Sequence, residues 1–132
     1  MKMYRWKVVY RRKWRMATSA SRVAFALNKE RALAIVTDRI SHFNTIYNFQ
    51  IGKVSIKNQT TRWGSCSKKG NLNFNYRIVN LPPELQDYLV VHELCHLQEF
   101  NHSKAFWDLM GKAIPDYRAR RQALRAIHVN RV

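Results

Sequence analysis

Two histidines four residues apart constrain this chain more than any other feature of its sequence. The segment reads His92-Glu93-Leu94-Cys95-His96, and it follows a proline pair and a run of apolar residues. Proline in the first turn, with Glu84 near the positive end of the helix dipole, favours a helix that begins close to residue 81. Residues four apart on a helix lie one turn above each other on the same face. Both imidazoles can therefore reach a single metal ion.

A third histidine, His102, follows six residues after His96. Six residues on one helix would add about 9 Å of rise and a rotation of about 240°, so the helix must end and the chain must fold back. Asn101 tolerates the left-handed conformation that such an end requires, and Ser103 can cap a following helix. Three protein ligands are typical of a catalytic zinc site, so we predict Zn²⁺ on His92, His96 and His102. The alternatives for the third ligand are Asp108, Asp116 and His128.

Glu93 directly follows the first of these histidines. It projects about 100° further around the helix, where its carboxylate can reach a water molecule rather than the metal. We predict that Glu93 is the general base of a metal-assisted hydrolysis. Cys95 lies near His92 by helical spacing, either packing behind the ligands or closing the site as a fourth ligand. The candidates for substrate contact or oxyanion stabilisation are Arg62, Tyr76, Arg77 and Tyr117.

No proline or glycine occurs from Ser19 to Phe49. We predict a long helix over residues 17–49, with a break near Asn28 and an end at Gly52. The apolar residues that recur there at helical intervals are Ala24, Leu27, Ala34, Ile35, Ile40, Phe43 and Ile46.

Residues 50–77 show strand-like alternation on both sides of a polar stretch. Residues 64–70, with two glycines and several serines, are typical of a turn, so we predict a β-hairpin with one buried face. The alternating apolar residues are Val54 and Ile56 before the turn and Leu72, Phe74 and Tyr76 after it.

The remaining residues, 81–127, are predicted to form the helix that carries His92 and His96, followed by two C-terminal helices. Their expected bounds are about 81–100, 103–114 and 116–127. The basic segment of residues 1–16 interleaves aromatic and charged residues and fits either a strand or an amphipathic helix. The predicted fold class is α+β.

The composition favours one compact domain over residues 1–132. A chain of 132 residues with 46% hydrophobic residues can build one core but is too short for two ordinary domains. No apolar run approaches the roughly 20 residues of a membrane span, and no secretory signal is present. The basic N-terminus also fits an organelle presequence. Two cysteines are too few for a disulfide scaffold, so we expect a cytoplasmic protein.

The formal net charge of +16 is unevenly distributed. Residues 78–117 hold two basic and six acidic residues, a net charge of −4, so the other 92 positions carry +20. Such a surface attracts phosphate backbones and acidic partners. No known nucleic-acid-binding motif is present, so we expect at most non-specific nucleic-acid binding through the basic surface.

Several motifs agree in order and spacing with one known family. They are Thr61-Arg62-Trp63-Gly64-Ser65-Cys66-Ser67, Gly70-Asn71-Leu72-Asn73-Phe74-Asn75, Leu81-Pro82-Pro83-Glu84, residues 91–97, Asn101-His102-Ser103, Phe106-Trp107 and Pro115-Asp116-Tyr117. Over most of residues 50–125 the chain resembles the YgjP-like metallopeptidase domain, which is related to the WLM and SprT-like zincins.

The resemblance implies a zincin-like α+β fold, zinc on the three histidines and Glu93 as general base. It also implies that the hairpin lies over the active-site helix as an edge for an extended peptide. The chain departs from the family upstream, where a longer strand-rich segment is common, and this leaves substrate recognition open. The WLM and SprT-like relatives cut proteins bound to DNA, which the basic positions would suit.

We therefore predict a zinc-dependent metallopeptidase that acts on a protein or peptide substrate. One alternative is a zinc-dependent hydrolase of nucleoside triphosphates, with Arg62 and nearby lysines meeting the phosphates. The other is a non-enzymatic basic adaptor in which Cys95 completes a structural zinc site. The sequence leaves the oligomeric state open.

Overall fold

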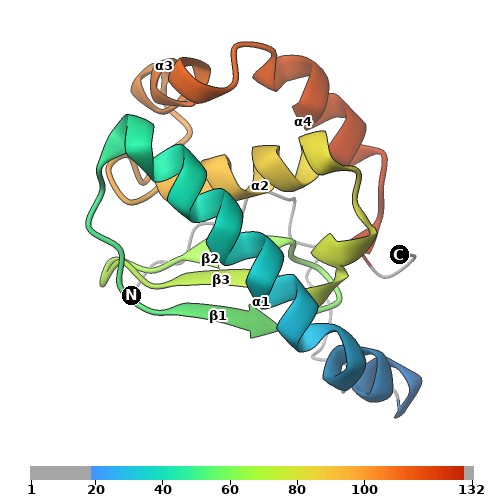
Figure 1. Ribbon diagram of the computed structural model, residues 1–132. Coiled ribbons are helices and arrows are strands. Elements are labelled where there is room, and N and C mark those ends of the chain that lie inside the picture. Colours follow the sequence, from blue (N-terminus) through green and yellow to red (C-terminus); the bar gives the residue numbers. More distant parts are fainter. Residues whose placement is uncertain (1–18, 130–132) are drawn as a thin grey trace.

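The computed structural model describes residues 19–129, which form a mixed α and β fold (Figure 1). The predicted α+β class is therefore confirmed. The predicted strand or helix of residues 1–16 lies outside the described residues. Among the helices described, none combines the length and the apolar character that crossing a membrane requires. The elements are α1 (Ser19–Tyr47), β1 (Val54–Lys57), β2 (Gly64–Cys66), β3 (Leu72–Asn75), the 3-10 helix η1 (Tyr76–Asn80), α2 (Pro83–Cys95), α3 (Lys104–Ala113) and α4 (Tyr117–Arg125).

The predicted long helix is α1, which spans 29 residues without interruption. The predicted break near Asn28 is wrong. The side chain of Asn28 donates a hydrogen bond to the carbonyl of Ala24, one turn earlier, at 2.8 Å, so it lies along the helix instead of ending it.

α1 ends at Tyr47, earlier than the predicted end at Gly52. Asn48 has a φ of 55°, the left-handed conformation that often follows the last helical residue. The Asn44 side chain then accepts from the N–H of Phe49 at 2.8 Å and donates to its carbonyl at 3.0 Å. Asparagine chemistry, rather than a glycine, therefore ends this helix.

The three strands form one sheet in the order β1-β3-β2. β1 and β3 are parallel, with Val54 opposite Leu72, and β2 is antiparallel to β3, with Gly64 opposite Phe74. The predicted hairpin between β1 and β3 is therefore wrong, because parallel strands cannot be joined by a tight turn. The hairpin is formed by β2 and β3, and its turn includes Gly70 at a φ of 84°.

Strand β2 occupies residues that the sequence assigns to a turn. Gly64, Ser65 and Cys66 have little strand propensity of their own, yet all three are buried, and the strand that they form contacts α2. Tertiary packing therefore outweighs local preference here. Tyr76, predicted to continue the last strand, instead begins η1.

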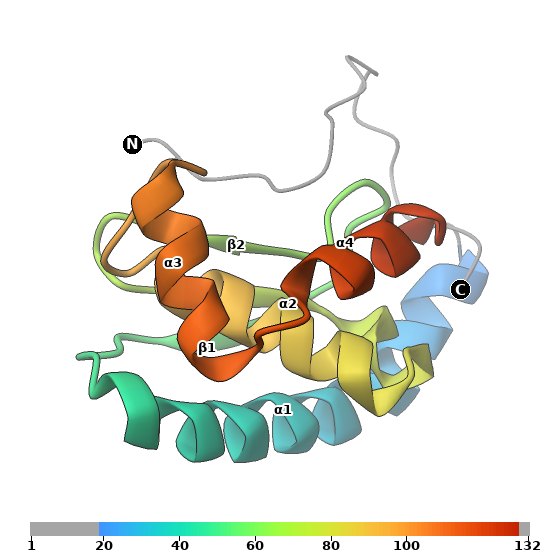
Figure 2. The ribbon, with the colours of Figure 1, turned by 90° about the horizontal axis from the view of Figure 1, so that it is seen from above.

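Helix α2 is the central element of the fold. In Figure 1 the sheet lies below α2, α3 and α4 lie above it, and α1 crosses in front. Figure 2 shows α1 running along one side of the molecule, past β1 and α2. α2 contacts α1, β2, α3 and α4, and every residue from Tyr88 to Cys95 is buried. The histidine motif is therefore held inside the core.

α2 ends at Cys95, well before the predicted end near Phe100. The backbone N–H groups of Leu97 and Glu99 donate to the carbonyls of Leu94 and Cys95 at 3.0 and 2.9 Å, which closes a turn. Asn101 is not left-handed, because Asn48 is the only non-glycine residue with positive φ among those described. α3 and α4 lie within one or two residues of their predicted bounds.

Candidate metal centre

The end of α2 brings His92 and His96 onto one face. His92 lies in the last helical turn and His96 is the C-cap residue, whose backbone N–H donates to the His92 carbonyl at 3.3 Å. The two residues are 1% and 0% exposed. Helical spacing therefore places two buried imidazoles next to each other, with their ring centroids 4.7 Å apart.

The turn after α2 carries His102 back to these two histidines. Its Nε2 atom lies 3.1 Å from Nε2 of His92 and 3.1 Å from Nε2 of His96. The ligand nitrogens of all three residues lie within 4.8 Å of one another. We call these three residues the histidine cluster, and its geometry allows it to hold one metal ion.

The alternative ligands do not join the histidine cluster. No group of three metal-binding side chains in residues 19–129 includes Asp108, Asp116, His128 or Cys95. The carboxylates of Asp108 and Asp116 instead accept from lysine and arginine on their own helices, at 2.8 and 3.2 Å. Cys95 is buried against Tyr47 of α1, and burial raises the pKa of its thiol to about 12.

Two aromatic residues of α3 surround the histidine cluster. The Phe106 ring is fully buried, and its centroid lies between 4.6 and 5.1 Å from those of the three imidazoles. Trp107 stacks with His102 at 5.9 Å. This surrounding disfavours positive charge on the imidazoles.

The imidazoles are consequently held neutral. Burial lowers the pKa of His96 to about 4, although the hydrogen bond that its ring donates to the Glu99 carbonyl acts in the opposite direction. Burial likewise lowers the pKa of His92 and His102, and the neighbouring charges contribute in the same direction. Neutral imidazole is the form that binds metal ions.

The backbone also sets the tautomer of His96. Its Nδ1 atom lies 3.0 Å from the Glu99 carbonyl oxygen, which can only accept a hydrogen bond, so Nδ1 carries the proton. In a neutral ring Nε2 then presents a lone pair, and it presents it toward His102. A carbonyl bonded to the outer nitrogen is the usual support of a metal-binding histidine.

Glu93 is fully buried beside strand β2, and its Oε2 atom lies 3.4 Å from Nδ1 of His92. Gly64 of β2 approaches so closely that a Cβ atom added there would lie 3.0 Å from this same oxygen. Glycine at position 64 therefore lets the edge strand pass next to the carboxylate. The sequence analysis missed this role, and the Arg62-to-Cys66 motif of the family resemblance was the available signal.

The predicted substrate-contact residues lie in different places. Tyr117 stacks on Trp107 at 5.1 Å, and Trp107 stacks in turn on His102, so these rings connect Tyr117 to the histidine cluster. The ring of Tyr76 packs edge-on against Phe25 of α1 at 5.8 Å. Arg62 is half-buried just before β2, where its carbonyl accepts from the side chain of Asn75 at 2.9 Å.

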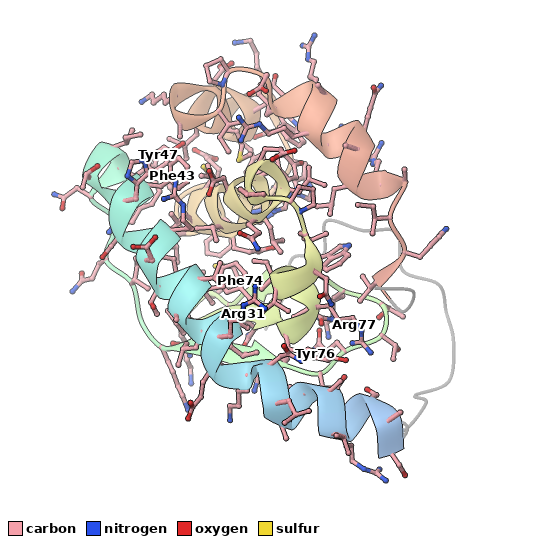
Figure 3. All side chains as sticks on the ribbon, turned by 45° about the vertical axis from the view of Figure 1, so that its right-hand side comes forward. Arg31, Phe43, Tyr47, Phe74, Tyr76 and Arg77 are labelled. Atoms are coloured by element: carbon pink, nitrogen blue, oxygen red, sulfur yellow. The ribbon has the colours of Figure 1, made fainter. Side chains whose placement is uncertain are left out.

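Arg77 is buried in a second polar cluster. Figure 3 shows Arg77 and Tyr76 near the N-terminal half of α1. Its Nη1 atom donates to the Gln59 carbonyl at 3.0 Å and to Oδ1 of Asn58 at 3.3 Å, and Nη2 donates to Oγ of Ser21 at 3.4 Å. We call these four residues the Arg77 cluster. Its contacts join α1, the loop after β1 and η1.

α4 contributes charges that the sequence analysis did not single out. The guanidinium of Arg121 lies 4.7 Å above the Trp107 ring. After burial, the charges of Arg121 and Arg125 also contribute to the low pKa of His102. The spacing of the arginines at positions 118, 121 and 125, which places them on one helix face, was the signal available in the sequence.

A buried histidine pair from a His-Glu-x-x-His helix, joined by a third histidine, is typical of metal-dependent peptidases. The chain belongs to the YgjP-like metallopeptidase domain family, whose model matches residues 7–127. The family resemblance inferred from the motifs is confirmed.

The fold is also similar to a solved metallopeptidase. The crystal structure of the metallopeptidase zymogen of Pyrococcus abyssi abylysin superimposes with a TM-score of 0.63 and 27% sequence identity. The match covers 69% of this chain and 92% of the other chain. No curated protein sequence matches significantly. Family and structure together support a peptidase that acts on peptide bonds and uses a metal ion.

Proposed function

We propose that this chain is a zinc-dependent peptidase in which the histidine cluster holds the zinc ion and Glu93 serves as general base. The observation that carries the proposal is the convergence of three neutral imidazoles. Nε2 of His102 lies 3.1 Å from Nε2 of each of the other two histidines. Nitrogens bound tetrahedrally to zinc at 2.0–2.1 Å would be spaced by about 3.3 Å, so only a small adjustment is needed.

The cluster also supports a catalytic rather than a structural role for the metal. A structural zinc site has four protein ligands, and Cys95, the alternative fourth ligand, lies outside the group of three that residues 19–129 provide. A bound zinc ion supplies Lewis acidity, which lowers the pKa of water and polarises the scissile carbonyl.

Glu93 would accept a proton from the attacking water and deliver it to the leaving amine. Its carboxylate is excluded from bulk solvent, and Oε2 lies 3.4 Å from Nδ1 of His92. Electrostatic interactions are stronger in such a site than in water. The close approach of Gly64 limits the carboxylate to a small range of positions.

Strand β2 is the natural place for an extended substrate. It is an edge strand of the described sheet and contacts the helix that carries Glu93. A peptide that pairs with an edge strand gains backbone hydrogen bonds regardless of its sequence. Tyr117, through its stack with Trp107, is the candidate for stabilising the oxyanion.

The test combines zinc stoichiometry with hydrolysis of an unstructured protein, for example reduced casein, by wild type and by Glu93→Gln. We expect one zinc per chain in both proteins and a loss of hydrolysis of about 10²- to 10⁴-fold in the variant, because the general base is gone. Glu84→Gln removes one carboxylate from the exposed first turn of the same helix and should leave the rate unchanged.

Zinc binding without any peptide-bond cleavage by wild type would refute the proposal and favour a nucleotide hydrolase or an adaptor. The same assay with added duplex DNA tests the role of the basic surface. Stimulation that disappears as salt increases is expected if nucleic acid concentrates the enzyme and its substrate.

A further inference from the structure

A hollow of about 370 Å³ lies beside the histidine cluster, where α3 and α4 meet. Trp107, one of its lining residues, stacks with His102 at 5.9 Å, so the hollow begins next to the proposed zinc ligand. We call it the arginine hollow. Its lining residues are Trp107, Tyr117, Arg118, Arg121, Gln122 and Arg125.

The arginines of this hollow pair with no acidic side chain in the part of the chain that the structure describes. All eight acidic residues of the chain lie within residues 19–129, yet no ion pair in this range involves Arg118, Arg121 or Arg125. Arg120, on the same helix but outside the hollow, does pair with Asp116, at 3.2 Å.

The spacing of these three arginines lowers the stability of α4. Arg118, Arg121 and Arg125 are three and four residues apart, so like charges lie next to one another on one face of α4. Aromatic rings hold two of them, because Arg121 lies 4.7 Å above Trp107 and Arg118 lies 5.9 Å above Tyr117. Three guanidinium groups, two of them positioned by aromatic rings and none paired with an acidic side chain, form a site for an anion.

We propose that the arginine hollow binds a carboxylate of the peptide substrate and thereby directs cleavage to bonds near an acidic group. The inference rests on the proposed peptidase function. Guanidinium and carboxylate are both planar, so they form paired, charge-assisted hydrogen bonds. The carboxylate can belong to an aspartate or glutamate side chain or to the end of the substrate chain.

The distances suit a group close to the scissile bond. The ring centroids of His102 and Trp107 are 5.9 Å apart, and those of Trp107 and Tyr117 are 5.1 Å apart. An extended peptide advances about 3.3 Å per residue, so two or three residues cover about 7–10 Å. A carboxylate within three residues of the cleaved bond therefore reaches the hollow.

The same rings favour a carboxylate over a nucleic acid strand. Single-stranded nucleic acids bind by stacking bases on aromatic side chains that are open to them. Here the Trp107 ring already stacks with Tyr117 and His102 and is covered by Arg121. The charged groups, and not the ring faces, are what the hollow presents to a ligand.

The experiment begins with one bond of reduced casein that the wild-type protein cleaves, identified by mass spectrometry. Synthetic peptides around this bond, with acetylated and amidated ends, carry glutamate or glutamine at one of the three positions on either side. We expect at least one position at which glutamate raises kcat/KM by roughly 10- to 100-fold over glutamine, as for a hydrogen-bonded charge. A peptide that ends at that position with a free C-terminal carboxylate tests whether the end of the substrate chain, instead of an acidic side chain, supplies the carboxylate.

The variant Arg118→Gln/Arg125→Gln should abolish this preference. It leaves in place Arg121, which contacts Trp107, so metal content and folding can be checked independently. Lys29→Gln/Arg31→Gln removes the same charge from the exposed surface of α1 and should keep the preference. As a binding readout, Glu93→Gln should bind the glutamate peptide more tightly than the glutamine peptide.

The outcomes separate the two proposals. A wild-type protein that cleaves none of the peptides refutes the peptidase function itself. Equal cleavage and equal binding of the glutamate and glutamine peptides, or a preference that survives in Arg118→Gln/Arg125→Gln, refutes only the carboxylate site. The site is also refuted if this variant loses affinity for a duplex DNA oligonucleotide while wild type shows no glutamate preference.

Discussion

The histidine cluster, in which His92 and His96 are buried and His102 is exposed, and the Arg77 cluster, built around the buried Arg77, are both polar. They satisfy their polar atoms in opposite ways. The Arg77 guanidinium donates outward to three neutral acceptors on two segments, α1 and the loop after β1, at 3.0 to 3.4 Å. The three imidazoles instead turn their Nε2 atoms inward, toward one another, at 3.1 Å. A single neutral ring cannot donate and accept at the same nitrogen, so this second arrangement needs something else at its centre.

The comparison teaches how to separate a structural polar cluster from a functional one. Both terminal nitrogens of the Arg77 guanidinium have protein acceptors, so the cluster ties the elements together without a ligand. In the histidine cluster the outer nitrogen of His96 is bonded to a carbonyl and the inner lone pair remains for a metal ion. Four variants or conditions test this contrast.

The largest expected effect is on metal affinity. His96→Ala removes one of the three proposed ligands, so zinc affinity should fall by more than about 100-fold. This exceeds the loss expected when a residue that only hydrogen-bonds to a metal ligand is replaced. Competition with a chelator measures it. Arg77→Met should bind zinc as wild type does, and equal losses in the two variants would mean that the contrast between the clusters is wrong.

The second effect is a pH dependence of the metal-free protein. Burial lowers the pKa of His96 from 6.5 to about 4. Between these values the unfolded chain binds a proton that the folded chain does not, so stability falls as pH decreases, by about 3 kcal/mol in total. Burial of His92 acts in the same direction.

Urea unfolding at pH 7 and pH 4.5 checks this sign, with His96→Gln as the variant in which the slope should be reduced. Arg77→Met should keep the wild-type slope. If the wild-type protein loses no more free energy of unfolding between pH 7 and pH 4.5 than His96→Gln loses, the imidazoles are not desolvated as described.

The third effect concerns the Arg77 cluster alone. Arg77→Met leaves the Gln59 carbonyl and the Asn58 side chain without this buried donor, and should reduce the free energy of unfolding by about 2 kcal/mol. Arg31→Met, on the exposed surface of α1, should change it by less than about 0.5 kcal/mol. If the two variants lose similar amounts of unfolding free energy, the Arg77 cluster has no structural role.

The smallest effect probes the contact between β2 and Glu93. Gly64→Ala adds a Cβ atom 3.0 Å from the Glu93 carboxylate, and should lower kcat about tenfold by displacing it, with zinc content unchanged. Gly111→Ala is the matched control, because its Cβ would meet only Tyr117, at an ordinary 3.8 Å. Full activity of Gly64→Ala would mean that the position of the carboxylate is not critical.

Much of the fold could be predicted because it depends on local patterns. The spacing of His92 and His96, the proline at the start of α2 and the absence of breakers in α1 all act within one or two helical turns. The predicted helix ends were wrong where side-chain or backbone hydrogen bonds outweigh the local sequence pattern. Asn44 and Asn48 end α1 before Gly52, and the turn after Cys95 needs no left-handed residue at Asn101.

The sequence by itself therefore determined the helices and the three histidines that come together, because each follows from the spacing of nearby residues. It also determined the family, through the motifs that residues 50–125 share with it. Only the tertiary structure decided that β1 and β3 run parallel, that Gly-Ser-Cys forms the edge strand β2, and that Arg121 and Arg125 of α4 lie close enough to His102 to lower its pKa. Strand pairing and contacts between distant segments depend on burial in the assembled core, which no local pattern encodes.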